Sequence, residues 1–223
     1  SHTTIPLRLE ARHDTGARGH LSLDGSGHGR IDSDLIELPD GPLTVETWVR
    51  PRDLSGRRGL VAKTESSEFG LFASDAQANV HVHLGGRYVE CTSASPLLTS
   101  GAWHHVAGVY DGQEVRLYVD GTLACAESGS GARTRNALPF IIGGDVDGRG
   151  QAVSLIDADL DEVRVSSVAR YAGDRFTPER RFEVDEATVV LLGFDERRGP
   201  FLVDRSGRDA HAVLSGSGTV VED

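Results

Sequence analysis

Acidic residues crowd into one stretch of this sequence. Gly144-Asp-Val-Asp-Gly148 and Asp157-Ala-Asp-Leu-Asp-Glu162 place six carboxylates within 18 positions. Crowded carboxylate oxygens repel one another, and a hard cation such as Ca²⁺ relieves that repulsion by taking roughly six to eight oxygen ligands. In a strand, Asp157, Asp159 and Asp161 would share one face. The clusters predict a calcium site, against the alternative of a solvated acidic rim.

A second set of residues could recognise a sugar. His81 and His83 alternate with apolar residues between positions 80 and 84, so their imidazoles share the polar face of a strand. Planar polar groups and aromatic faces suit the hydroxyls and the apolar faces of sugar rings. The predicted ligand-binding residues are His81, His83, Arg87, Tyr88 and Tyr110.

The same histidines allow a zinc alternative. Two histidines at positions i and i+2 of a strand can chelate zinc if a neighbouring strand adds ligands. The pair His104-His105 is the candidate neighbour. The competing interpretation is an ordinary polar sheet face.

Composition limits the class of partner. The chain has 223 residues and a formal net charge of −11, with a sequence pI near 5.2. Such an acidic chain lacks the basic footprint needed for nucleic acid or an anionic membrane. It also has no apolar run of about 18 residues, so we expect no membrane insertion. Hydrophobic residues make up 38%, which is enough for a core.

The elements that must position these residues are short strands. Segments of four to eight residues with β-branched or alternating apolar patterns recur along the chain, and Gly, Asp, Ser or Pro interrupts them. Asp111-Gly112, Asp120-Gly121 and Gly85-Gly86 are typical of tight hairpin turns. The pattern predicts an all-β fold, an antiparallel two-sheet β-sandwich. Ile31 to Leu38 is one expected strand, and Thr177-Pro178 is expected to begin a short helical turn.

The length favours one domain, which we place at residues 1–215 with 216–223 as a flexible tail. The two cysteines, Cys91 and Cys125, allow two interpretations. They can be small buried apolar residues, which we favour, or one disulfide in an exported domain.

Four stretches resemble a laminin G-like domain of the concanavalin A-like lectin and glucanase superfamily. The resemblance covers about 150 residues, and the order of the four stretches makes it specific. They are Leu23-Asp-Gly-Ser-Gly with Ile36-Glu-Leu-Pro, Leu43 to Pro51, Gly101 to Gly121, and Ile141-Ile-Gly-Gly144 with Asp159 to Val165. The resemblance implies a pentraxin-like jelly roll. Members often begin with a phrase found here near the C-terminus, Phe194-Asp-Glu196 followed by Asp204-Arg-Ser-Gly207. We expect the C-terminal strands to fill that place in the sandwich, rather than to open a second repeat.

The resemblance divides the predicted calcium ligands into two alternative sites. In pentraxin-like members, acids after the Gly-Gly strand hold calcium that contacts the ligand, which implies Asp145, Asp147 and Gln151. In related glucanases, an Asp opening the last long strand binds a structural calcium, which implies Asp161 with Asp24 as partner. We leave both sites open, with Ca²⁺ as the predicted cofactor.

Hydrolysis is not expected. Glycosidases of this superfamily carry two glutamates around an aspartate on one strand, a spacing that places the carboxyl groups about 5–5.5 Å apart. This chain has no Glu-x-Asp-x-Glu or Glu-x-Asp-x-x-Glu sequence. The resemblance therefore implies a non-catalytic recognition module that binds a glycan. The alternatives are a protein-interaction or adhesion module of a larger surface protein and, less favoured, a hydrolase or lyase. We expect an extracellular or cell-surface location, with the signal peptide outside this chain.

Overall fold

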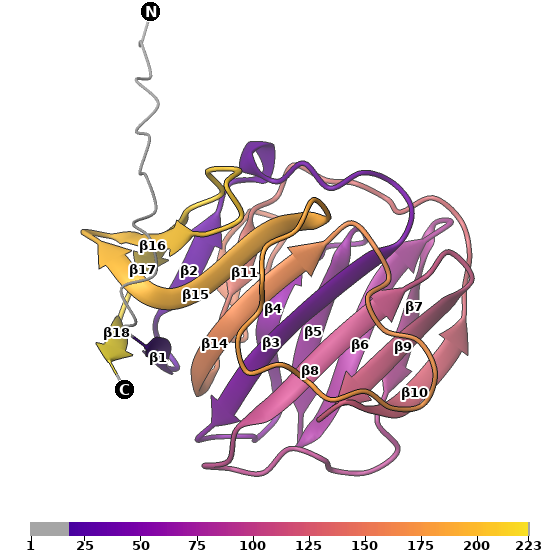
Figure 1. Ribbon diagram of the computed structural model, residues 1–223, viewed down its shortest axis with the longest axis horizontal. Coiled ribbons are helices and arrows are strands. Elements are labelled where there is room, and N and C mark those ends of the chain that lie inside the picture. The colour runs from indigo at the N-terminus through magenta and orange to yellow at the C-terminus, as the bar shows by residue number, and fades with distance from the viewer. Residues whose placement is uncertain (1–17, 223) are drawn as a thin grey trace, which may run out of the picture.

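Alternating apolar and polar residues fold into strands that stack as two sheets (Figure 1). The structure is a computed structural model and describes residues 18–222. One short 3-10 turn, η1 (Ser33–Leu35), interrupts the strands near the start. Among the described residues, no helix has the length and apolar character needed to cross a bilayer. The predicted all-β sandwich is confirmed.

The strands have the following bounds: β1 Gly19–Asp24, β2 His28–Ile31, β3 Leu43–Pro51, β4 Arg57–Lys63, β5 Phe69–Ser74, β6 Gln77–Leu84, β7 Arg87–Thr92, β8 His104–Tyr110, β9 Glu114–Val119, β10 Thr122–Ser128, β11 Phe140–Ile142, β12 Asp145–Val146, β13 Ala152–Val153, β14 Asp157–Ser166, β15 Thr188–Arg198, β16 Phe201–Asp204, β17 Ala212–Ser215 and β18 Gly218–Glu222.

The first sheet has the strand order β10-β9-β8-β3-β14-β15, and the second has the order β7-β6-β5-β4-β11-β2. Strands β16 and β17 join β15 to β2, so hydrogen bonding continues from one sheet into the other. The first half of β14 pairs with β1, and its second half pairs with β15. The C-terminal strands therefore complete the sandwich.

The core lies between the sheets and collects one face of each strand. Val80 and Val82 of β6 point inward with Leu71 of β5, and all three side chains are fully buried. Val106 of β8 and Leu117 of β9 meet them from the first sheet. Removing this apolar area from water is the main favourable contribution to folding.

Tight turns set the register of the hairpins. Asp120 and Gly121 both have positive φ, at 50° and 71°, between β9 and β10. Gly85 and Gly86 also have positive φ, between β6 and β7. Positive φ at both central residues gives the turn a twist that matches the strands it connects.

A disulfide joins the outermost strands of the two sheets. Cys91 of β7 bonds to Cys125 of β10, with the Cα atoms 5.7 Å apart. The favoured interpretation, two unpaired apolar cysteines, was therefore wrong. The sequence separation of 34 residues contained no signal of the pairing, because only the stacking of the sheets brings β7 beside β10.

Three local predictions differ from the structure. The strand expected at 31–38 ends at Ile31, and η1 follows. The helical turn expected at Thr177 is instead irregular chain across the first sheet. The tail expected at 216–223 contains β18, which pairs with β1 because the backbone of β1 offers an unpaired edge there. Residue 223 lies outside the described residues.

The irregular segment 167–187 covers the outer face of the first sheet, where it crosses β3, β8 and β9 (Figure 1). Under it lies a buried polar network around Glu46. The Glu46 carboxylate accepts hydrogen bonds from His105 Nε2 at 3.0 Å, Arg164 Nε at 2.8 Å and the Tyr171 hydroxyl at 2.7 Å. Burial raises the pKa of Glu46, but His105 and Arg164 outweigh it and hold that pKa below its ordinary value.

Candidate functional site

The outer face of the second sheet carries most of the predicted sugar-binding residues. Because Val80 and Val82 point into the core, His81 and His83 point outward from β6. Tyr88 pairs with His83 across the β6–β7 ladder and shares that face. The structure thus brings three of the five predicted ligand residues together, with His83 buried and its Nδ1 2.8 Å from Thr134 Oγ1. We call this surface the histidine face.

Aromatic rings form a row across the histidine face. The ring of Phe72 in β5 lies 4.9 Å from that of His81, which lies 5.8 Å from that of Tyr88. His83 packs edge-on against Tyr88 at 4.8 Å. The Tyr88 hydroxyl donates to the Ser67 carbonyl at 3.1 Å, which fixes its ring. The row is therefore preorganised by neighbouring strands and loops.

Two charged side chains extend this row. The Arg57 guanidinium lies 3.8 Å from the ring centroid of Phe72, and its Nη1 donates to Asp145 Oδ2 at 2.7 Å. Asp145 lies here because Gly59 lets the loop after β11 approach β4. A Cβ at Gly59 would lie 2.1 Å from the Gly144 carbonyl carbon. The structure therefore joins a predicted calcium ligand to the predicted sugar-binding face.

Burial makes His81 a neutral hydrogen-bonding group. It lowers the pKa of His81, Glu90 opposes that shift, and Arg57 adds to it. A neutral imidazole has one donor nitrogen and one acceptor nitrogen. His81 can thus both accept from and donate to ligand hydroxyls near neutral pH.

The other two predicted ligand residues lie elsewhere. Tyr110 of β8 is 2% exposed in the core, where its hydroxyl donates to the Gly131 carbonyl. Its strand belongs to the first sheet, so it cannot reach the histidine face. Arg87 is the exposed first residue of β7, and the alternation of that strand turns it away from Tyr88.

The remaining predicted calcium ligands lie in three separate places: Asp147 with Gln151, Asp24, and Asp161, which is described below. Asp147 Oδ1 accepts the backbone N–H groups of Arg149 and Gln151 and so stabilises its own turn. Asp24 caps Ser26 and pairs in register with Asp157 rather than with Asp161. Within residues 18–222, no group of three His, Cys, Asp or Glu side chains is arranged to hold a metal ion.

The zinc alternative needs histidines that the fold separates. His104 and His105 belong to β8 in the first sheet, whereas His81 and His83 face outward from the second. His104 Nδ1 lies 2.8 Å from Asp120 Oδ2, and its Nε2 accepts the Thr99 N–H. His104 therefore stabilises a turn.

The side chain of Asp161 forms an ion pair with Arg180 of the segment 167–187. The environment of this carboxyl group predicts that the stability of the fold depends on pH. Burial raises the pKa of Asp161 to about 7, against the opposing effect of the Arg180 guanidinium 2.6 Å away. A carboxyl group with a raised pKa binds more protons in the folded chain, so stability falls as pH rises from about 4 to about 7. We expect a contribution on the order of 2 kcal/mol across this range, which Asp161→Asn removes. Thermal melting of both proteins across this range tests it, and equal slopes would contradict it.

Sequence reasoning missed a groove at one end of the sandwich. One wall of the groove is η1 and the residues that follow it, and the other wall is residues 135–137. In its floor is a pocket of about 140 Å³, lined by Ser33, Ile36, Leu38, Lys63, Glu68, Phe69, Arg135 and Asn136. We call it the end groove. Its only sequence signal was that Lys63 is the sole lysine of the chain.

The sequence matches a known family over residues 23–174, described as the concanavalin A-like lectin/glucanases superfamily. No curated protein matches it. Among solved structures, a candidate carbohydrate binding protein from Bacteroides ovatus superposes with a TM-score of 0.66 at 20% identity. The match covers 90% of this chain and 60% of that one.

Two smaller proteins share the fold. A heptameric SAP-like pentraxin from Limulus polyphemus has a TM-score of 0.59 at 16% identity, with 92% of this chain and 95% of that chain covered. The CBM40 of a Ruminococcus gnavus sialidase, bound to α2,3-sialyllactose, has a TM-score of 0.54 at 12% identity, covering 70% and 93%. The family match spans more than half of the sequence, and the chain therefore belongs to the concanavalin A-like lectin/glucanases superfamily, in its laminin G-like branch.

Proposed function

We propose that this chain is a non-catalytic recognition module that binds carbohydrate through the histidine face. The observation that carries the proposal is the His81 and Tyr88 rings beside the Arg57–Asp145 pair, with the fully buried Phe72 ring supporting them from beneath Arg57. Aromatic rings pack on the apolar faces of sugars, while guanidinium and carboxylate groups bind their hydroxyls.

Two further findings support this proposal. Carbohydrate binding is named for two of the similar structures, from Bacteroides ovatus and Ruminococcus gnavus. The alternative of a protein-binding surface would be favoured by a continuous exposed apolar patch. The exposed large apolar side chains instead lie on separate segments, at Leu35, Leu97, Val153, Val168, Val184, Val213 and Val221.

The disulfide supports an extracellular setting, because such bonds persist in oxidising compartments and are rare in the cytosol. Calcium stays a prediction. For Asp145 to serve as a ligand, its carboxylate would have to exchange Arg57 and Thr64 for the ion. Glycan or extracellular protein remains the proposed class of partner.

Arg57→Ala is expected to weaken glycan binding at least tenfold, because it removes a charge-assisted donor worth about 1.5–3 kcal/mol. A glycan array identifies the ligand, and calorimetry with that ligand measures the loss. Arg197→Ala is the matched control, since Arg197 is exposed and its Nε bonds to Gly199 in its own turn.

Both array and calorimetry are run with Ca²⁺ and with chelator. If glycan binding persists in chelator, calcium is not required for it, and the proposed carbohydrate binding still holds. An array without any bound glycan in either condition would overturn the proposed function, as would equal affinities of the Arg57 and Arg197 variants.

A further inference from the structure

We propose that the end groove is a second binding site, which takes the edge of one neutral sugar ring in its pocket. The proposal shares the carbohydrate class with the proposed function but uses different residues. Three observations carry it: an unpartnered carboxylate oxygen, the charge balance around it and an apolar lining.

Glu68 provides the unpartnered oxygen. The residue is 6% exposed, and its side chain lines the pocket. Glu68 Oε2 accepts the Arg133 Nε–H at 2.7 Å, whereas Oε1 lies 3.9 Å from Lys63 Nζ, beyond hydrogen-bond distance. Oε1 is not among the buried atoms without a partner, so it is open to the pocket, where a ligand hydroxyl can donate to it.

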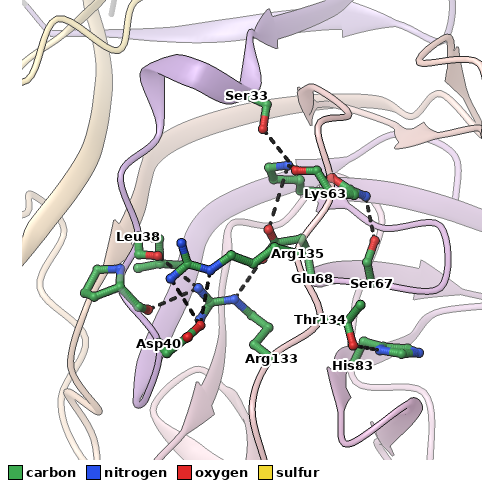
Figure 2. Close-up of polar contacts among 12 residues, drawn as sticks. Ser33, Leu38, Asp40, Lys63, Ser67, Glu68, His83, Arg133, Thr134 and Arg135 are labelled. Carbon is green, nitrogen blue, oxygen red and sulfur yellow. Dashed lines mark hydrogen bonds and ion pairs between the residues drawn. The ribbon is translucent and has the colours of Figure 1, made fainter.

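Lys63 cannot turn toward Glu68 to satisfy that oxygen. Its ammonium group donates to Asn136 Oδ1 at 2.6 Å, to the Asn136 carbonyl at 2.9 Å and to the Leu138 carbonyl at 2.8 Å. These three bonds use all of its donors. Figure 2 shows Glu68 between Lys63 and Arg133, with Arg135 and Asp40 beside them.

The charges around the pocket favour a neutral ligand. Two cations, Lys63 and Arg133, already face the single Glu68 carboxylate, so a third cation would be repelled. An anion would meet Glu68 Oε1 and the exposed carboxylates of Asp34 and Glu37 on the groove wall. A hydroxyl group donates to a carboxylate without adding charge.

The pocket has the size and lining for a sugar edge. Ile36, Leu38 and Phe69 give the pocket its apolar lining. Leu38 and Phe69 are buried and Ile36 is partly exposed, so Ile36 is the apolar side chain on which the C–H groups of a ring can pack. A volume of about 140 Å³ corresponds to roughly five waters at ~30 Å³ each, which admits part of one ring. The open groove on both sides leaves room for the rest of a glycan. The exposed Arg135 at the rim lies 3.1 Å from Asp40 Oδ1 through Nε and Nη2, and its other N–H groups can donate to ring or hydroxyl oxygens.

The test is saturation-transfer NMR on the full chain with three kinds of probe: neutral methyl hexosides, methyl glucuronide and methyl glucosaminide. At least one neutral hexoside is expected to bind, and Glu68→Gln is expected to abolish its signal. Arg135→Ala should weaken binding about tenfold without touching the buried cluster, so the result does not depend on the folding of the Glu68 variant. Arg197→Ala is the control for a lost surface arginine.

His81→Ala separates this proposal from the proposed function. Hexoside signals that survive His81→Ala but disappear with Glu68→Gln and weaken with Arg135→Ala support a second site. Signals lost only with His81→Ala, signals confined to the charged glycosides, or no signal at all would overturn it. An unaffected affinity in Arg135→Ala would overturn it as well.

Discussion

Glu46→Ala is expected to lower the free energy of unfolding by about 3–5 kcal/mol, because it leaves buried cationic and polar partners without their carboxylate. Glu46 and His105 are fully buried, and Arg164 is 5% exposed. The guanidinium of Arg164 and the hydroxyl of Tyr171 both donate to the Glu46 carboxylate. Urea unfolding followed by tryptophan fluorescence measures the loss.

Two variants make this result specific. Glu186→Ala removes an exposed glutamate of the same segment, 167–187, and should change stability by less than about 0.5 kcal/mol. Glu46→Gln keeps an acceptor for Arg164 but loses the charge, so its cost should be intermediate. A loss below about 1 kcal/mol in Glu46→Ala would show that segment 167–187 does not depend on this network.

Removing the disulfide is expected to have the second large effect. Cys91→Ala combined with Cys125→Ala should lower the free energy of unfolding by about 3–4 kcal/mol, since the bond closes a loop with a sequence separation of 34 residues. Without it, β7 and β10 are joined at the open edge of the sandwich only by packing.

Reductant provides the internal control for this prediction. The wild-type protein should melt at a lower temperature in reductant, and the double variant should show no further change. A double variant as stable as the oxidised wild-type protein would contradict the expected role of the bond.

Local sequence could predict the sandwich because strand alternation and turn chemistry act over a few residues. The alternation in β6 gives the inward valines and outward histidines, and Asp120-Gly121 forms the expected turn. The same reasoning failed at Ile31–Leu38, where apolar residues line the end groove instead of forming a strand. Apolar side chains near a pocket need no regular alternation.

The candidate site was only partly predictable, for a topological reason. His81, His83 and Tyr88 lie on one hairpin, so their shared face follows from period-two geometry. Tyr110 follows the same alternation but sits in the other sheet and points inward. Arg57 was missed because Asp145, its partner, lies 88 residues away in the sequence.

By itself, the sequence determined the all-β class, the main hairpins, the laminin G-like family and the polar side of β6. Tertiary structure decided that Asp145 meets Arg57 rather than a cluster of other acids, and that Asp161 meets Arg180. It also decided that Cys91 meets Cys125 and that Glu68 keeps an open oxygen in a pocket. The physical reason is range. Strand and turn preferences come from neighbouring residues, whereas ion pairs, a disulfide and a pocket depend on how separate strands stack.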